Sequence, residues 1–185
     1  MRIVGGKFRG RRFHPPANQW PTRPTTDFAK EGLFNILLNR IDFEGTKMLD
    51  LFGGTGNHTY EAISHGCRAV TYVEKHYPCI KFVKETCSKL GIENHVQIVK
   101  SDVAKYLKRS AEAFDYIFAG PPYGLPWLDD IPDMVLGGPW LSQQGLFVLE
   151  HNQQHDFKGH LNFQELRTYG GTHFSFFGAK DTIAD

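Results

Sequence analysis

Four short segments of the chain carry side chains suited to binding a small molecule. They are DLFGGTG at residues 50–56, Glu74, Asp102, and GPPY at residues 120–123. Each follows a short apolar stretch, as expected at the end of a buried strand. Glycines let the backbone lie against a ligand, and carboxylates bind hydroxyl groups and cations. No lysine follows the glycines at the spacing that clamps a triphosphate. The set therefore predicts a site for a positively charged nucleoside, such as a sulfonium.

Each of the three acids has a ligand-binding interpretation and a simpler structural one. Glu74 can bind the two hydroxyls of a ribose, or it can serve as a helix-cap partner. Asp102 can accept from an adenine amine, but Ser101-Asp102 before Val103 is also a good helix N-cap, and the residues alone leave the two interpretations equal. Asp50 stands next to the glycines, which favours a ligand role over a cap.

The glycine run has one competing interpretation, a dinucleotide-binding fingerprint. That fingerprint would need Gly or Ala at position 59, where this chain has Thr59. No further glycine precedes Gly54 at the usual spacing, so the match is weak.

The elements that must position these residues alternate between strand and helix. Helical patterns at 59–65, 77–90, 103–111 and 129–136 separate apolar strands at 47–52, 69–74, 95–99, 114–119 and 145–151. This alternation predicts a mostly parallel sheet covered on both faces, with ligands bound beyond the carboxyl ends of its strands. Two further strands, at 163–169 and 172–177, flank a glycine pair and predict an antiparallel hairpin at the sheet edge. A helix capped by Thr26 or Asp27, apolar over residues 30–40, is expected before the first strand.

The first 26 residues differ from the rest in charge. They hold six of the 21 basic residues and none of the 20 acidic ones. A basic segment of this kind predicts a polyanionic partner, the alternative being a solvated surface strand. We expect residues 1–26 to form a basic hairpin and a proline-rich connector, and residues 27–185 to form the main domain. Phe8 and Phe13 either stack on unpaired bases or, as we favour, pin the hairpin to the domain.

The composition excludes several other classes of protein. A chain of 185 residues with 41% hydrophobic and 22% charged residues is typical of one globular domain. No apolar run approaches the ~20 residues that cross a bilayer, and no secretory signal begins the chain. Three cysteines without metal or disulfide spacing, together with scattered histidines, predict no metal site. We therefore expect a cytoplasmic protein with no membrane and no metal partner.

Taken together, these segments resemble a known family. DLFGGTG, Glu74, Asp102 and GPPY are similar to the motifs of class I S-adenosylmethionine-dependent methyltransferases. RIVGGKFRGRRF at 2–13 and RPTTDFAKEGLFNIL at 23–37 narrow the resemblance to bacterial enzymes that methylate N2 of a guanine in 16S ribosomal RNA. The resemblance extends over nearly the whole chain.

The resemblance implies an α/β fold, Rossmann-like, with a seven-stranded, mostly parallel sheet, a C-terminal antiparallel hairpin and a small basic N-terminal hairpin. It implies S-adenosylmethionine as the cofactor, ribosomal RNA or the small ribosomal subunit as the partner, and a monomeric enzyme. It places Arg23, Thr25 and Thr26 near the mouth of the active site. The implied site residues are, for the cofactor, Asp50, Phe52, Gly53, Gly54, Thr55, Gly56, Glu74 and Asp102; for catalysis, Gly120, Pro121, Pro122 and Tyr123; and for RNA, Lys7, Arg9, Arg11, Arg12, Arg23 and Thr25.

Gly120 departs from the family pattern, which has Asp or Asn at this position. In the family, that side-chain oxygen accepts a hydrogen bond from the amine that is methylated, whereas Tyr123 can still stack on an extruded base. Three hypotheses follow: an enzyme of reduced or altered efficiency, which we favour; a substitute acid, such as Asp129 or Asp130; or a protein that binds cofactor and RNA without efficient chemistry.

Two other functions stay open from the sequence. A DNA adenine-N6 methyltransferase uses the same Pro-Pro-Tyr chemistry on another amine, but the chain has no room for a separate target-recognition domain. A non-catalytic RNA-binding or ribosome-assembly protein would keep the basic segment and the cofactor site and lose turnover.

Overall fold

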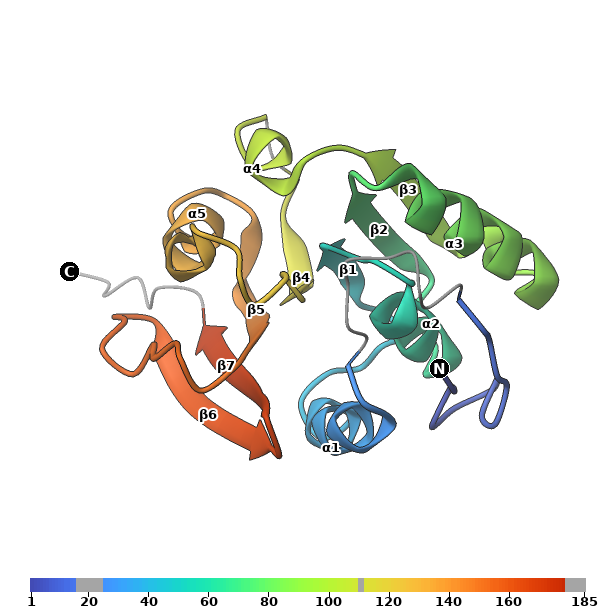
Figure 1. The fold of residues 1–185 in the computed structure, drawn as a ribbon, viewed down its shortest axis with the longest axis horizontal. Coiled ribbons are helices and arrows are strands. Elements are labelled where there is room, and N and C mark those ends of the chain that lie inside the picture. Colours follow the sequence, from blue (N-terminus) through green and yellow to red (C-terminus); the bar gives the residue numbers. More distant parts are fainter. Residues whose placement is uncertain (16–24, 110–111, 179–185) are drawn as a thin grey trace.

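A computed structural model describes residues 1–15, 25–109 and 112–178 of the chain. Its centre is a seven-stranded sheet in the order β3-β2-β1-β4-β5-β7-β6 (Figure 1). The strands are β1 (Lys47–Leu51), β2 (Ala69–Glu74), β3 (Val96–Lys100), β4 (Phe114–Ala119), β5 (Leu141–His151), β6 (Phe163–Tyr169) and β7 (Thr172–Gly178). β1 to β5 pair in parallel, and β7 pairs antiparallel with both β5 and β6. The predicted sheet and its C-terminal hairpin are confirmed.

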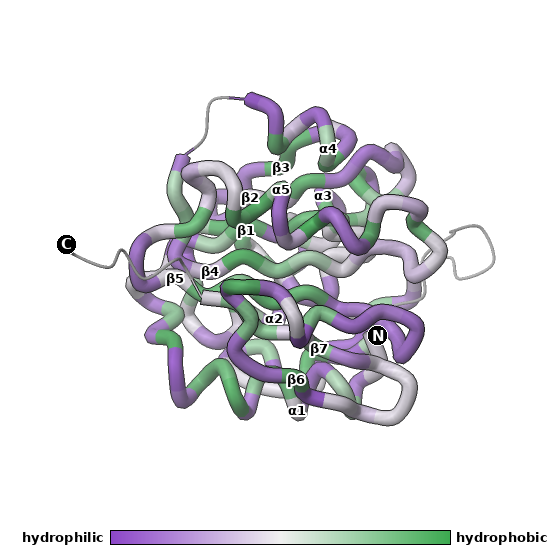
Figure 2. Tube along the Cα trace, turned by 90° about the vertical axis from the view of Figure 1, so that its left-hand side faces the viewer, coloured by the Kyte–Doolittle hydropathy of each residue, from purple (hydrophilic) through white to green (hydrophobic). Residues whose placement is uncertain are grey.

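Helices cover both faces of the sheet (Figure 1). They are α1 (Asp27–Leu37), α2 (Asn57–Ser64), α3 (Tyr77–Leu90), α4 (Val103–Tyr106) and α5 (Ile131–Leu136), with short 3-10 turns η1 (Glu93–His95) and η2 (Leu128–Asp130). Buried residues of α1, α2 and α3 form one core cluster with the sheet, and those of α4 and α5 form the other. Met48 belongs to the first cluster and Leu49 to the second, as the period of two in a strand requires. Figure 2 shows apolar residues gathered along the central strands.

Capping residues account for several of the helix limits. The Thr26 hydroxyl accepts a hydrogen bond from the amide of Ala29 at 3.2 Å, which confirms it as the N-cap of α1. Gly91, in the left-handed region with φ of 68°, ends α3. Gly56, also in the left-handed region with φ of 76°, is the N-cap of α2. This helix therefore begins at Asn57 rather than at residue 59 as predicted.

Two elements differ in length from their predictions for reasons of packing. α4 ends at Tyr106, where a helix over 103–111 was predicted, and only Val103 of it is buried; residues 110 and 111 lie outside the described residues. β5 begins at Leu141 rather than at residue 145, because Leu141 pairs with Phe114 across a register shift in β4. Both differences lie away from the carboxyl ends of the strands, where the site is expected.

Candidate active site

The loop between β1 and α2 has a strained backbone held by the side chain of Tyr72. Phe52 has φ of 58° and is the one non-glycine residue with positive φ in the described part of the chain. Such strain, of order 1–3 kcal/mol, clusters at functional sites. A Cβ at Gly53 would lie 2.2 Å from the Tyr72 ring, and the Tyr72 hydroxyl donates to the carbonyl of Gly54 at 2.6 Å. Glycine at position 53 is therefore needed for the loop to close on Tyr72.

Glu74, the last residue of β2, is oriented by three backbone amides. Its Oε2 accepts from Gly54 at 3.0 Å, and its Oε1 accepts from Lys75 and His76, both at 2.8 Å. The side chain is buried, so these bonds fix the carboxylate against the glycine loop. The three amides fix the direction of the carboxylate, and its contact with the hydroxyls of a ribose stays a prediction.

Asp102 caps the helix that follows it. Its Oδ1 accepts from the amides of Ala104 at 3.1 Å and Lys105 at 3.4 Å, and its Oδ2 lies 3.3 Å from the ammonium of Lys75. The cap interpretation is confirmed. Asp102 also lines a cavity with Glu74, so its contact with an adenine amine stays a prediction.

Asp50 is almost completely buried beneath the glycine loop. Burial raises the pKa of its carboxyl to about 7, an effect that the hydrogen bonds from Thr59 partly oppose and the charge of Glu74 reinforces. The Thr59 hydroxyl donates to its Oδ2 at 2.5 Å. A carboxyl in this state gains most from a cationic ligand, because a nearby positive charge favours the ionised form.

Two adjoining cavities bring the predicted residues together. The main cavity has a volume of about 310 Å³, and a second of about 210 Å³ shares Phe52 and Pro122 with it. Glu74 and Asp102 line the second cavity, whereas Asp50 and the segment after β4 line the main one. The main cavity is lined by Thr25, Asp50, Phe52, Gly53, Gly54, Thr55, Asn57, His58, Phe118, Gly120, Pro121, Pro122, Tyr123, Gly124 and Glu150. Gly56 lines neither cavity and acts on the loop through its backbone conformation.

A side chain at Gly120 would not strain the backbone, but it would contact the ring of Phe118 tightly. Its amide donates to the carbonyl of Leu51 at 3.2 Å, and its φ lies outside the left-handed region. A Cβ there would lie 3.2 Å from a ring atom of Phe118, whose ring stacks on His58 with centroids 3.7 Å apart. Another residue at position 120 thus keeps the backbone and displaces Phe118 by a few tenths of an ångström.

Glu150, near the end of β5, is a cavity residue to which the sequence assigns no role. Its Oε1 accepts from the Tyr123 hydroxyl at 2.8 Å, and its Oε2 accepts from the Thr25 hydroxyl. Burial raises the pKa of this carboxyl, and the two hydroxyl donors oppose the rise. The sequence signal that could have indicated Glu150 was an acidic residue near the end of an otherwise apolar strand. Thr25, predicted to contact RNA at the mouth of the site, does lie in the cavity, whereas Arg23 falls outside the described residues.

Asp129 and Asp130 do not take the place of the missing acceptor. Both lie in η2, are exposed, and line neither the main cavity nor the second one. Asp129 instead pairs with His155 at 2.7 Å. The hypothesis that one of them reaches the amine is wrong, because η2 directs them to the surface beside the segment around His155.

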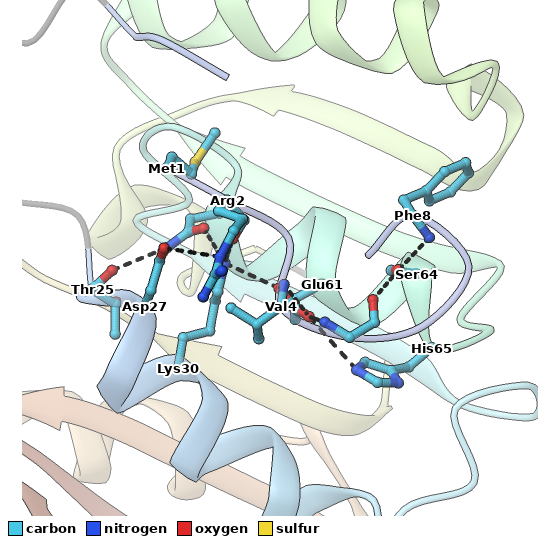
Figure 3. A network of polar contacts seen from close by, with 12 residues as sticks. Met1, Arg2, Val4, Phe8, Thr25, Asp27, Lys30, Glu61, Ser64 and His65 are labelled. Carbon is cyan, nitrogen blue, oxygen red and sulfur yellow. Dashed lines mark hydrogen bonds and ion pairs between the residues drawn. The ribbon is translucent and has the colours of Figure 1, made fainter. Parts of the chain in front are cut away.

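The basic hairpin is anchored to α1 and α2 (Figure 3). The amides of Val4 and Gly5 donate to the Glu61 carboxylate, and the amide of Phe8 donates to the Ser64 hydroxyl at 2.9 Å. Phe8 is buried, and the half-buried Phe13 packs against Tyr60 with ring centroids 5.6 Å apart. The pinning role predicted for both phenylalanines is confirmed. The four basic side chains left on the exposed face are those of Lys7, Arg9, Arg11 and Arg12.

Neither a metal cluster nor a membrane-spanning helix was found among residues 1–15, 25–109 and 112–178. No group of three or more His, Cys, Asp or Glu side chains there is placed to hold a metal ion. No helix in the same ranges is long and apolar enough to cross a membrane.

Comparison with known proteins identifies the family. A family model described as Conserved hypothetical protein 95 matches residues 1–178. The chain belongs to this family. The putative rRNA methyltransferase YlbH of Bacillus subtilis (strain 168) is 32% identical to the chain over 178 residues, which are 93% of this chain and 95% of the relative. Ribosomal RNA small subunit methyltransferase D of Buchnera aphidicola is 30% identical over 150 residues, which are 81% and 75% of the two chains.

A solved structure shares the fold over almost its whole length. A hypothetical protein of Thermus thermophilus has a TM-score of 0.83 and 28% identity, and the match covers 97% of this chain and 99% of that one. The predicted family is thereby confirmed: the chain is a class I S-adenosylmethionine-dependent methyltransferase. The predicted enzyme class and cofactor are confirmed with it.

Proposed function

We propose that the chain transfers a methyl group from S-adenosylmethionine to the exocyclic N2 amine of a guanine in small-subunit ribosomal RNA. The observation that carries the proposal is the pair of cavities joined at Phe52 and Pro122, one with acids for a nucleoside and one with an aromatic ring and a buried acid for a base. The relatives named as ribosomal RNA methyltransferases support the choice of RNA. One chain supplies both cavities, which favours action as a monomer.

The cofactor would lie across the two cavities. Glu74 would accept from the ribose hydroxyls, Asp102 from the adenine amine, and Asp50 would face the positive charge at the methionine end. When bound, S-adenosylmethionine supplies a methyl group attached to a cationic sulfur. Phe52, shared by the two cavities, would then separate the nucleoside end from the reacting end.

The target base would enter the main cavity beside Tyr123. An extruded base stacks on an aromatic ring that Pro121 and Pro122 hold rigidly at the strand end. The lone pair of a guanine amine is delocalised into its ring, so a hydrogen-bond acceptor near the amine aids attack on the methyl group. Gly120 supplies no side-chain acceptor, and losing one positioned group of this kind typically costs on the order of 10²–10³ in rate. We therefore propose an enzyme of reduced efficiency compared with relatives that carry the acceptor.

RNA would be held by the anchored hairpin. Lys7, Arg9, Arg11 and Arg12 project from one exposed loop, and each phosphate that they neutralise releases condensed counterions. Because Glu61 and Ser64 fix the hairpin to α2, directly after the cofactor loop, RNA bound there has a defined position relative to the cavity.

The proposal is tested with purified protein, methyl-labelled S-adenosylmethionine, and small-subunit RNA that lacks the modification, both as naked RNA and as assembled subunits. We expect label in one of the two substrates, and N2-methylguanosine in the nuclease digest by mass spectrometry. N6-methyladenine in DNA would instead identify the enzyme as a DNA methyltransferase. Cofactor binding by calorimetry without transfer to any substrate would favour a non-catalytic RNA-binding protein.

A further inference from the structure

Glu150 is a buried carboxylate with no cationic partner among residues 1–15, 25–109 and 112–178. Its side chain is 5% exposed, and its two hydrogen-bond donors are the neutral hydroxyls of Tyr123 and Thr25. No ion pair joins it to a basic side chain in the described ranges of the chain. Burying an anion against neutral donors alone is costly. A functional reason for the charge is therefore expected.

The position of Glu150 points to contact with the target base. It lines the main cavity with Gly120 and Tyr123, and it also lines a third hollow of about 350 Å³ that adjoins that cavity. Each carboxylate oxygen has two lone-pair positions, and each has one of them occupied by a hydroxyl. Both oxygens can thus accept one further hydrogen bond from a ligand. A base stacked on the Tyr123 ring has its edge near this carboxylate, because the Tyr123 hydroxyl lies 2.8 Å from Oε1.

We propose that Glu150 selects guanine by accepting hydrogen bonds from its N1–H and its N2 amine, one at each carboxylate oxygen. This inference rests on the proposed function, in which the substrate is a guanine. Guanine alone among the four bases presents two adjacent donors at its Watson–Crick edge. Adenine and cytosine present a donor beside an acceptor, which would place a lone pair against a carboxylate oxygen. Glu150 thus recognises the base by attraction and excludes the others by repulsion.

The same contact accounts for how Gly120 is tolerated. The amine to be methylated needs an acceptor, and the side chain that supplies it in the family is absent here. Glu150 reaches the same cavity from β5 and holds the N2 amine as part of its contact with the base edge.

The test uses a base analogue that changes one donor. The target guanine is first located by mapping the methyl label to an RNA fragment, and it is then replaced in a synthetic RNA by 2-aminopurine, which keeps the N2 amine but has an acceptor at N1. We expect the wild-type enzyme to prefer guanine over 2-aminopurine in kcat/KM by on the order of tenfold to a hundredfold. Glu150→Gln presents one acceptor and one donor, which match 2-aminopurine, so its preference should fall to unity or reverse.

Further variants separate base recognition from a merely structural role. Glu150→Asp keeps the carboxylate and Tyr123→Phe keeps both the ring and the carboxylate, so both should retain the guanine preference at a lower rate. Asp129→Asn, a loss of charge outside the main cavity, should keep the wild-type ratio. Thermal unfolding and cofactor affinity verify that each variant is folded.

The outcomes distinguish the inference from the function on which it rests. An equal preference in the wild type and Glu150→Gln, with both methylating guanine, would overturn the inference while leaving the proposed function intact. If Glu150→Gln does not fold, loss of the guanine preference in Glu150→Asp or Tyr123→Phe overturns it instead. Absence of N2-methylguanine with the wild type refutes the proposed function itself.

Discussion

The buried ion pair between Lys30 and Glu61 should decide whether the basic hairpin stays attached to the domain. The Lys30 ammonium lies 3.0 Å from Glu61 Oε2, and the two side chains are 1% and 0% exposed. The ammonium also donates to the carbonyl of Arg2 at 2.5 Å (Figure 3). It donates to Asn57 at 2.7 Å as well. Burial lowers the pKa of Lys30, and Glu61 opposes this effect. Burial alone would raise the pKa of Glu61, but the hydrogen bond from His65 and the charge of Lys30 bring it below its ordinary value.

Glu61→Gln should reduce the free energy of unfolding at pH 7 by about 3–5 kcal/mol, because it leaves a buried ammonium without its counter-charge. The amide group of glutamine would also bring a donor towards the backbone amides of Val4 and Gly5, which now donate to the carboxylate. Urea unfolding followed by tryptophan fluorescence measures the change. Hydrogen exchange at residues 1–15 should rise in the same variant.

A double-mutant cycle isolates the pair from its surroundings. Lys30→Met with Glu61→Gln removes both charges, so the double variant should be destabilised by clearly less than the sum of the two single variants. Asp27→Asn is the matched control, because Asp27 forms an exposed pair with Arg2 of the same hairpin at 3.4 Å and should cost no more than about 1 kcal/mol. Additive single variants, or a Glu61→Gln cost as small as that of the control, would refute the reasoning.

Three further predictions concern catalysis, cofactor binding and RNA. Gly120→Asp should raise the rate of methyl transfer by up to about 10²–10³. Gly120→Ala is the control for added bulk against Phe118, and a labelled-cofactor assay that shows no gain for Gly120→Asp over wild type would contradict the prediction. Burial raises the pKa of Asp50 to about 7. The neutral carboxyl therefore contributes its full stability to the ligand-free protein below pH ~4, and this contribution is lost as the pH rises through 7. The free energy of unfolding of Asp50→Asn, measured in urea, should therefore rise relative to that of the wild type between pH ~4 and 7. A difference between the two proteins that does not change with pH would count against the raised pKa. Arg9→Ser with Arg11→Ser should lower the salt dependence of RNA binding by about two in log–log slope with unchanged cofactor affinity, and an unaltered slope would exclude the hairpin from the RNA contact.

The gathering of Asp50, Glu74 and Asp102 at one edge of the sheet could be predicted because it follows from a local rule. The acids and glycines directly follow apolar strands, and a parallel sheet brings the ends of its strands to one edge. Asp50, Glu74 and Asp102 needed no knowledge of distant contacts to be placed there. Their exact partners were less accessible, and Asp102 serves as a helix cap as well as a cavity residue.

The base half of the site depends on contacts that the sequence does not display. β5 reads FVLE over residues 147–150, and an unbroken apolar run gives no alternation from which the direction of Glu150 could be inferred. Its partner Thr25 is 125 residues away in the chain. Asp129 and Asp130 attracted attention by their proximity to Tyr123 in sequence, yet η2 leaves both at the surface.

The division between these two halves also explains how a methyltransferase site can lose an acceptor at position 120 and still be organised for a base. The cofactor end is built from the ends of β1, β2 and β3, and the base end from β4, β5 and the residue before the cap of α1. Tyr123 and Glu150 are tied to each other by a hydrogen bond that does not involve Gly120. Loss of a side chain there removes one contact to the amine without loosening the stacking ring or the buried carboxylate. If the proposed function holds, the missing acceptor should therefore affect the rate of the chemical step more than the identity of the base.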